Sequence, residues 1–370
     1  MDRNNDMIVS NQLFSILVIT VIGIGVLSLP RILATEAGPD SLILLLLSSI
    51  IFLIIALVTQ RLIMKFPKQN IIEITNSVLF KPIGILVGLV YFIYIFILIT
   101  LEVRAFGEIT KNFLLLNTPI EVIIIIFLIT TIYLVRSGIE SIARMAVIIL
   151  PLSIIPAIFI SLVAIPDLDF TCFLPILRTP FADLIRALPK LFFSFIGFEL
   201  ILIWTFFVKD TENIKKTVIS AVGFISLVYF IFTGITIARF GIAENKDLIW
   251  PVITLFRDVD IPGTLVENVE VVIMATWLLS IFMTIAISYF GAVFLLSRIL
   301  KSKEHNYIPV ILLPIIYVLS LVPDNIAEVY DYLDKFSIYV GTVFVIAIPV
   351  MLLFISFFTK KTKGGIRKNG

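Results

Sequence analysis

The stretch Gly23-Ile24-Gly25-Val26-Leu27-Ser28-Leu29-Pro30 interrupts the first long apolar segment of the chain near its midpoint. A glycine inside a helix costs about 1 kcal/mol relative to alanine, so a helix formed by this segment is predicted to break here. A second apolar segment has a similar interruption at Phe193-Ser194-Phe195-Ile196-Gly197-Phe198-Glu199, where a glycine lies close to a carboxylate. Two interruptions at matching places predict a fold built from two related halves.

The composition places these segments in a lipid bilayer. Of the 370 residues, 60% are hydrophobic and only 15% are charged, and the mean hydropathy is +1.13. Soluble domains are about half apolar and a quarter charged, so a soluble enzyme is excluded. The net charge of +2 argues against a nucleic-acid-binding surface. Because Cys172 and His305 are the single residues of their types, no internal disulfide, metal cluster or cofactor is expected.

Ten segments have the length and apolar character of membrane-spanning helices, about 20 residues each. They cover residues 10–34, 39–63, 83–106, 119–135, 141–165, 184–208, 216–239, 264–298, 307–322 and 335–358. Because they are apolar on all sides, helices are favoured over the alternating strands of a barrel. The expected fold is therefore an all-α integral membrane protein in which residues 1–370 form one transmembrane domain. Five segments per half would give residues 10–165 and 184–358 opposite orientations in the membrane.

The distribution of charge predicts the orientation of the chain, because cytoplasmic loops carry an excess of Lys and Arg. If the N-terminus is cytoplasmic, that side holds 18 of the 28 Lys and Arg residues. The opposite side then holds 18 of the 26 Asp and Glu residues. Ten segments return the C-terminus, with its five Lys and Arg residues, to the cytoplasm as well.

A helix broken at mid-membrane frees backbone groups, which is tolerable where they line a cavity and meet a polar ligand. Glycine-interrupted segments at matching positions of inverted halves are the best sequence indication of a central binding site. The outer half of the first segment would begin near Gly25 and Val26 with free amides, which suit a carboxylate. The outer half of the sixth would end near Ile196 and Gly197 with free carbonyls, which suit an ammonium. Together they predict a site for a zwitterionic amino acid, unless the glycines only permit close helix packing.

At these residues the sequence resembles a known family. The stretch from Gly23 to Arg31, followed by Glu36-Ala37-Gly38-Pro39-Asp40, is similar to the opening of the spore-germination permeases, the B subunits of nutrient germinant receptors. Further matches occur in the same order along nearly the whole chain: Leu101-Glu102-Val103-Arg104-Ala105, Phe195-Ile196-Gly197-Phe198-Glu199, Ile249-Trp250-Pro251 and Ile261-Pro262-Gly263. One departure is Leu265-Val266-Glu267-Asn268-Val269-Glu270, where the family usually has a Glu-Arg pair.

The resemblance implies a place in the amino acid–polyamine–organocation transporter superfamily. The implied fold is that of the leucine transporter, with 5+5 inverted repeats and broken helices 1 and 6. The implied role is the sensing of a small amino-acid-like germinant by a multi-pass protein of the bacterial cell membrane, the spore inner membrane. The implied partners are the germinant receptor A and C subunits and membrane lipid, with no nucleic acid.

In that fold, the third, eighth and tenth segments surround the broken helices. At 1.5 Å per residue, Tyr94 and Leu98 lie about 17–23 Å into the third segment and share one helical face. Thr284 and Ser288 repeat this spacing in the eighth segment, and Val340 and Gly341 are expected close-approach positions in the tenth. The expected substrate-binding residues are therefore Gly23, Gly25, Val26, Tyr94, Leu98, Ile196, Gly197, Thr284, Ser288 and Val340. Alternatively, the hydroxyls bond to their own helices and Tyr94 only packs between helices.

Three charged residues near these positions are candidates for coupling or gating. Glu199 lies within a segment, where a carboxylate is costly and functional by default; it is protonated, paired with a cation, or placed toward cytoplasmic water. Glu102 and Arg104 lie near the outer end of the third segment, where they would form a gate or a local ion pair. Trp204 fits a membrane-interface position.

A proton- or sodium-coupled amino-acid transporter is the alternative to a receptor subunit. Sodium-coupled members of the fold use neighbouring hydroxyls of the eighth segment, whereas Thr284 and Ser288 are not adjacent. Some proton-coupled members have a Lys in the fifth segment, which here has only Arg144 at its start. Both departures favour sensing. A channel is less favoured because no ring of charge is visible in the segments, and an enzyme least of all because no nucleophile–base constellation is present.

Overall fold

The computed structural model describes residues 7–258, 269–302 and 306–358. The family-like stretch Ile261-Pro262-Gly263, and residues 265–268 of the stretch that departs from the family, lie outside these residues. Among the described residues the secondary structure is helical, apart from an isolated bridge between Ile8 and Val208. The expectation of an all-α fold is therefore confirmed.

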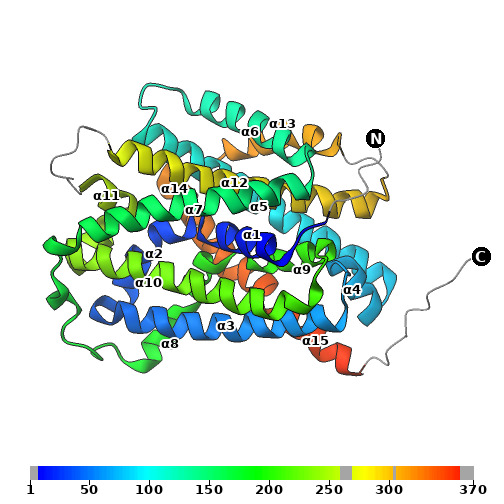
Figure 1. Cartoon of the computed structure of the whole chain (residues 1–370), viewed down its shortest axis with the longest axis horizontal. Helices are drawn as coiled ribbons and strands as arrows, with labels where there is room; N and C mark the ends of the chain where they lie inside the picture. The colour runs from blue at the N-terminus through cyan, green and yellow to red at the C-terminus, as the bar shows by residue number, and fades with distance from the viewer. Residues whose placement is uncertain (1–6, 259–268, 303–305, 359–370) are drawn as a thin grey trace, which may run out of the picture.

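The helices lie along one long axis as a bundle (Figure 1), and many of them run antiparallel to their neighbours. The α-helices are α1 Ser10–Ile22, α2 Gly25–Ala37, α3 Ser41–Lys65, α4 Ile71–Val78, α5 Lys81–Phe113, α6 Ile120–Arg136, α7 Ile139–Val163, α8 Phe181–Leu191, α9 Ile201–Trp204, α10 Ile214–Asp247, α11 Pro251–Asp258, α12 Val269–Leu300, α13 Ile308–Ser320, α14 Ile326–Phe336 and α15 Ile348–Phe358. The shorter elements used below are the 3₁₀ turns η1 Gly38–Asp40, η4 Phe192–Phe195, η5 Phe198–Leu200 and η6 Thr205–Phe207, and the π-helical turns η8 Ser337–Gly341 and η9 Val343–Ala347.

Much of the described chain has the length and apolarity needed to cross a membrane. Six helical stretches qualify: Gly25–Lys65, Lys81–Phe113, Ile139–Val163, Thr211–Asp247, Val271–Leu300 and Ile326–Phe358. The first joins α2 to α3 through η1, and these two helices pack against each other. The pair Phe181–Phe195 and Phe198–Phe207 qualifies together but bends by 56°. α1 and α13 are shorter apolar helices, so the chain is a multi-pass membrane protein.

Charge differs between the two ends of the bundle. At the end where α1 begins, which lies to the right in Figure 1, the Lys65 ammonium lies 2.9 Å from the Ser356 hydroxyl, joining α3 to α15. At the opposite end, the Lys190 ammonium lies 2.6 Å from the Glu36 carboxylate, joining α8 to α2. Arg239 there binds Asp167 and Asp258 at 2.9 and 2.7 Å. We call these the basic end and the acidic end.

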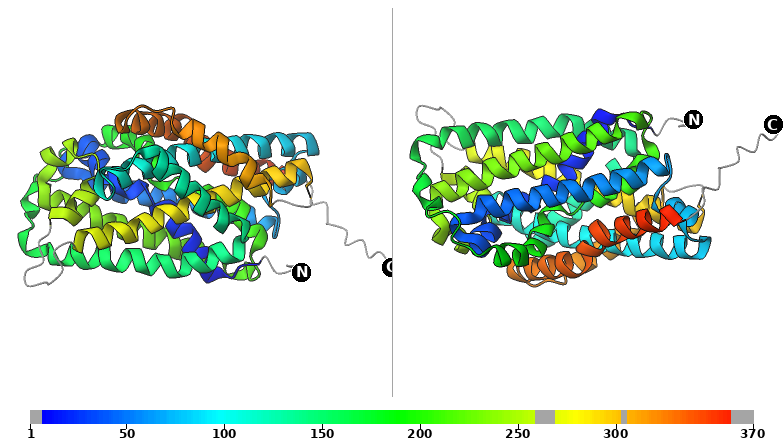
Figure 2. Two further views of the ribbon diagram at one scale, coloured as in Figure 1. Left: turned by 90° about the horizontal axis from the view of Figure 1, so that it is seen from above. Right: turned by 90° about the horizontal axis from the view of Figure 1, so that it is seen from below.

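The two broken segments lie in the middle of the bundle. α1 packs against α7, α10 and α12, and α2 packs against α3, α8, α10 and α11. The views from above and below show α3, α7 and α10 running past these central segments on the outside (Figure 2). Residues 21–30 and 191–200 are buried without exception, which places both breaks in the protein interior rather than against lipid.

The structure corrects one expectation and refines another. Trp204 is not at a membrane interface: its side chain is fully buried, with its ring 6.0 Å from that of Phe290. The polar connection after the seventh segment is largely helical, because α10 continues past a bend at Gly241 to Asp247 and is followed by α11. A tryptophan near the end of an apolar segment fits either location, and burial in the bundle decided between them.

Candidate functional site

The first break separates α1 from α2 at Gly23 and Ile24, and its freed carbonyl groups are bound by side chains from distant helices. The Tyr229 hydroxyl of α10 donates to the Val21 carbonyl at 3.0 Å. From α12, the Trp277 indole N–H donates to the Gly23 carbonyl at 3.1 Å, and the Thr284 hydroxyl donates to the Ile19 carbonyl at 2.9 Å. The end of α1 is therefore satisfied by protein donors, as a buried helix end requires.

The start of α2 is different, because no side chain caps it. Its N-cap residue, Ile24, offers no side-chain acceptor, and the residues that follow, Gly25 and Val26, are buried. The first amides of a helix lack partners within the helix and carry the positive end of its dipole. An uncapped helix start of this kind in the protein interior suits a carboxylate.

The second break falls at Ile196 and Gly197, between η4 and η5. Gly197 has a φ of +102°, which favours glycine, and a Cβ there would lie 2.7 Å from Cγ2 of Thr20. The Gly197 amide donates to both carboxylate oxygens of Glu199, at 3.1 and 2.9 Å. The Tyr94 hydroxyl donates to the same carboxylate at 2.7 Å. Glu199 is 1% exposed, so it lies at the break and away from water.

The two breaks are packed directly against each other. The Ser194 hydroxyl donates to the Gly25 carbonyl at 3.3 Å, and a Cβ on Gly25 would lie 2.9 Å from the Ser194 Cα. The Tyr229 hydroxyl, which binds Val21, also donates to the Ser194 carbonyl. On Gly23, a Cβ would lie 2.3 Å from the Thr284 hydroxyl oxygen. Glycine at position 25 is therefore required for the close approach of the two backbones, and glycine at position 23 leaves room for the Thr284 side chain.

Aromatic side chains enclose the carboxylate of Glu199. The Tyr94 ring stacks on Phe344 of η9, with centroids 4.0 Å apart, and on Phe336 of α14 at 5.3 Å. Tyr91, one turn earlier on α5, donates its hydroxyl to the Phe344 carbonyl at 3.4 Å. The π-helical turns of the tenth segment thus close over the second break, which isolates its charge from the bilayer.

The remaining predicted site residues lie at varying distances from the breaks. Leu98 is buried one turn beyond Tyr94 on the same face of α5, and Ser288 is buried one turn beyond Thr284 on α12. Val340 is half-buried and lines a groove formed by α5 and α14 rather than a break. Gly341, which was expected to approach closely as well, does so, since a Cβ there would lie 2.7 Å from Cδ1 of Ile196.

Glu102 and Arg104 do not pair with each other among the ion pairs of the described residues. The Arg104 guanidinium binds Glu108 at 2.9 Å and donates to the Asp324 carbonyl at 3.2 Å. Glu102 is 8% exposed and has a carboxylate oxygen without a hydrogen-bond partner. It shares the α5 face of Tyr94 and Leu98, because the three residues are spaced by four. Both residues are therefore buried, but only Arg104 has an ion-pair partner among the described residues.

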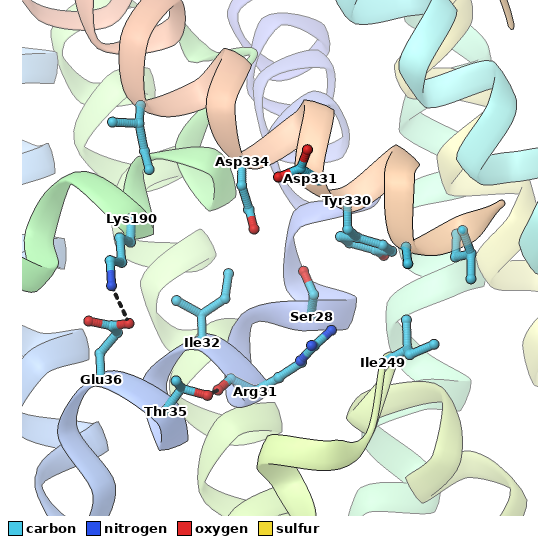
Figure 3. Close-up of a pocket in the computed structure, with 13 residues that line it drawn as sticks. Ser28, Arg31, Ile32, Thr35, Glu36, Lys190, Ile249, Tyr330, Asp331 and Asp334 are labelled. Carbon is cyan, nitrogen blue, oxygen red and sulfur yellow. Dashed lines mark hydrogen bonds and ion pairs between the residues drawn. The ribbon is translucent and has the colours of Figure 1, made fainter. Parts of the chain in front are cut away.

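A cavity of about 520 Å³ opens at the acidic end above the uncapped start of α2 (Figure 3). Ser28 and Arg31 of α2 line one side, and Tyr330 and Asp334 of α14 line the other. The Asp334 carboxylate points into the cavity, and the Arg31 guanidinium crosses its floor toward Ile249. In the described part of the chain, neither charge has an ion pair within 4.0 Å, so both are available to a ligand.

At the opposite, basic end, hydrogen bonds join the two broken segments to each other. The Ile8 amide donates to the Phe207 carbonyl at 2.9 Å, and the Lys209 amide donates back to Ile8 at 3.0 Å. The Ser10 amide donates to the Asp210 carboxylate at 3.0 Å, and its hydroxyl donates at 2.5 Å. These bonds fasten the start of α1 to the end of the sixth segment.

Sequence reasoning missed several residues that complete the site. Tyr229 and Trp277 lie inside apolar segments and are not among the predicted site residues. A hydroxyl or indole N–H inside a membrane must find an acceptor, and this signal could have marked both as partners of a broken helix. The sequence also offered a signal for Asp334, because this carboxylate directly precedes the tenth apolar segment.

The chain is similar to known germination proteins along most of its length. The sequence model described as "Spore germination protein" matches residues 7–329. Spore germination protein B2 of Bacillus subtilis (strain 168) is 29% identical over 350 residues, which are 94% of each chain. Spore germination protein A2 of the same organism is 30% identical over 351 residues, 93% of this chain and 94% of the relative.

The fold is similar to that of a transporter of the leucine-transporter type. The crystal structure of MhsT in complex with L-phenylalanine aligns with a TM-score of 0.68 over 93% of this chain and 87% of that chain. Sequence identity in the alignment is 15%, so this likeness shows the fold alone. The expected fold with broken helices 1 and 6 is confirmed. Because the family match spans most of the chain, the protein belongs to the spore germination protein family, as a permease-like membrane protein and not an enzyme.

Proposed function

We propose that this protein is the subunit of a nutrient germinant receptor that binds a small neutral amino acid, or a similar small nutrient, between its two broken helices. The observation that carries this proposal is the start of α2, which no side chain caps. It is buried against the second break, where Glu199 binds the Gly197 amide. The ligand carboxylate would bind the amides of Gly25 and Val26. Its ammonium would bind the carbonyl groups near Ile196 and the carboxylate of Glu199.

Ligand binding on this proposal requires the breaks to separate. Ser194 now touches Gly25, and Tyr229 bridges the two segments. A ligand between them replaces these contacts with its own polar groups. It shifts the equilibrium between the packed and the separated forms only by its difference in affinity for them. The receptor A and C subunits would read this shift as the germination signal.

The ligand would reach the breaks from the acidic end, through the cavity that Arg31 and Asp334 line. Two charges of opposite sign suit a zwitterion on its way to the site. The basic end, closed by Ser10 and Asp210, would face the spore interior. On this proposal both termini would lie in the cytoplasm, and the protein would lie in the spore inner membrane. Residues 10–165 and 184–358 would be its inverted repeats.

Coupled amino-acid transport is the second candidate, and the buried carboxylate of Glu199 is the observation that favours it. A carboxylate that exchanges its proton as the breaks separate would couple movement to a proton gradient. Uptake into proteoliposomes separates the two functions. Saturable uptake driven by an ion gradient would favour the transporter, and saturable binding without uptake would favour the receptor.

The site itself is tested by measuring equilibrium binding of a panel of neutral amino acids to the purified protein. Gly25→Trp should abolish binding, because its side chain must enter the space that the Ser194 backbone occupies. Gly223→Trp is the matched control, since Gly223 lies on an exposed face of α10 with open space around it. Normal binding by a folded Gly25→Trp variant would disprove the pocket assignment.

A further inference from the structure

A second cavity, of about 430 Å³, opens at the basic end between η6 and the end of α12. It lies at the opposite end of the bundle from the cavity of Figure 3. Its apolar part is formed by Phe206 and Phe207 of η6 and by Phe290 and Phe294 of α12, and its polar part includes Arg298 and Lys301. We call it the inner cavity. Four phenylalanine rings beside two cations describe a site for an amphiphilic anion.

Arg298 is placed above the aromatic rings. Its guanidinium carbon lies 4.6 Å from the Phe206 ring centroid and 5.1 Å from that of Phe294, so the cation contacts both rings. Its ion pair with Glu73 of α4 is 3.9 Å long, beyond hydrogen-bond distance. The side chain is 42% exposed. A guanidinium held in this way presents donors that match a phosphate.

Lys301 occupies a backbone position at which glycine is usual. The Ser302 amide donates to the Ser297 carbonyl at 3.0 Å, and the Lys301 amide donates to the Arg298 carbonyl at 3.3 Å. This pair of bonds closes the end of α12 as a Schellman motif, with Lys301 at the left-handed position and a φ of +52°. A cation near a helix end is favourable, but other positions in the last turn give that benefit without the strained backbone. The strained backbone therefore indicates that the Lys301 ammonium has a function at this position.

We propose that the inner cavity binds an anionic phospholipid of the cytoplasmic leaflet. The phosphodiester would lie between Arg298 and Lys301, and an acyl chain would lie against the phenylalanine rings. Anionic lipids attract clustered Lys and Arg at the cytoplasmic surface. Because η6 ends the sixth broken segment, the bound lipid would bridge this segment to α12. Phe207 also accepts the Ile8 amide, so the lipid would reinforce the closed inner end.

The test measures binding of phosphatidylglycerol to the purified full chain, by native mass spectrometry and by the lipid-dependent rise in unfolding temperature. Phosphatidylcholine and inorganic phosphate are the comparison ligands. The proposal expects a rise with phosphatidylglycerol and none with either comparison ligand. An equal rise with phosphatidylcholine would overturn recognition of the charge. An equal rise with inorganic phosphate would overturn the role of the acyl chain.

Lys301→Gly is the informative variant because it removes the charge and relieves the backbone strain together. It should bind phosphatidylglycerol about fivefold more weakly while its lipid-free unfolding temperature stays the same or rises. Lys68→Gly is the matched control: Lys68 is also at the basic end, is exposed, and has a φ of +58°. Arg298→Gln should weaken lipid binding as well. Equal lipid affinity in Lys301→Gly and Lys68→Gly would overturn the proposal.

Discussion

The carbonyl groups freed at Val21 and Gly23 are bound by Tyr229 and Trp277, which come from α10 and α12, whereas the amide of Gly197 is bound by Glu199, two residues along the same chain. The backbone groups freed at the first break are therefore bound by side chains of other helices. The Gly197 amide at the second break is bound by a residue of its own segment. Moving α1 away from α10 and α12 would expose its carbonyls, while the second break would keep its shape. This difference identifies the first break as the adjustable side of the proposed site.

The largest effect, on the stability of the protein, is expected from Gly197→Ala, which adds a methyl group at the second break. An L residue in the left-handed region costs about 1–2 kcal/mol, and forcing a methyl against Thr20 adds about 1–3 kcal/mol of overpacking. Thermal unfolding of the purified protein in detergent should show a much lower midpoint. Gly223→Ala, with open space around its Cβ, is the control and should be neutral or stabilising. Equal midpoints would show that the second break tolerates a side chain.

A smaller effect on stability but a large effect on ligand is expected from Glu199→Gln. The amide oxygen still accepts the Gly197 N–H, but the negative charge offered to a ligand ammonium is lost. A charged hydrogen bond contributes about 1.5–3 kcal/mol, which corresponds to about 10–100-fold in affinity. Tyr94→Phe keeps the charge and should weaken binding less. If both variants bind the ligand equally, Glu199 does not contact the ammonium.

Tyr229→Phe tests the contact that holds the two breaks together. It removes the hydroxyl whose single proton is shared between the Val21 and Ser194 carbonyls, at a cost of about 0.5–1.5 kcal/mol. Because this bond holds the packed form, its loss should lower the unfolding temperature modestly and tighten ligand binding at the same time. Isothermal titration with the ligand measures this. Weaker binding by Tyr229→Phe would mean that the hydroxyl contacts the ligand directly.

The smallest effect concerns the tie between Ser10 and Asp210 at the closed end. Burial raises the pKa of Asp210, but hydrogen bonds from Ser10 and Asn213 outweigh it and hold the pKa below its ordinary value of 3.8. The tie is therefore fully present above this value and is lost as the pH falls through the lowered pKa. The hydrogen-exchange protection factors of the Ile8 and Ser10 amides, which are corrected for the intrinsic slowing of exchange at low pH, should fall in acid, and in Asp210→Asn they should already be lower near neutral pH.

Asp169 provides the control for the effect of Asp210. Its pKa is lowered by hydrogen bonds from the side chain and amide of Thr171, but it lies on the acidic side of the bundle, after α7. Asp169→Asn should leave exchange at Ile8 and Ser10 unchanged. If it accelerates their exchange as much as Asp210→Asn does, the tie is not a local contact.

Much of the fold could be predicted because its signals are local. Apolar segments of membrane-spanning length indicated the helices, and glycines at 23, 25 and 197 indicated where two of them break. The spacing of Tyr94 and Leu98 indicated a shared face of α5. Val340 shows where such reasoning stops: it and the adjacent Gly341 were both expected to approach closely, but in this π-helical turn only Gly341 meets Ile196. Apolar sequence patterns do not register a π turn.

The sequence by itself determined the membrane environment, the helical class and the positions of the two breaks, because hydropathy and the backbone energy of glycine act at the residue where they occur. Only the tertiary structure decided what fills the breaks. Tyr229 reaches Val21 across 208 positions of the chain, and Trp277 reaches Gly23 across 254. A carbonyl freed in the interior must be bound by some donor, but packing of the whole bundle selects which donor lies within 3.1 Å.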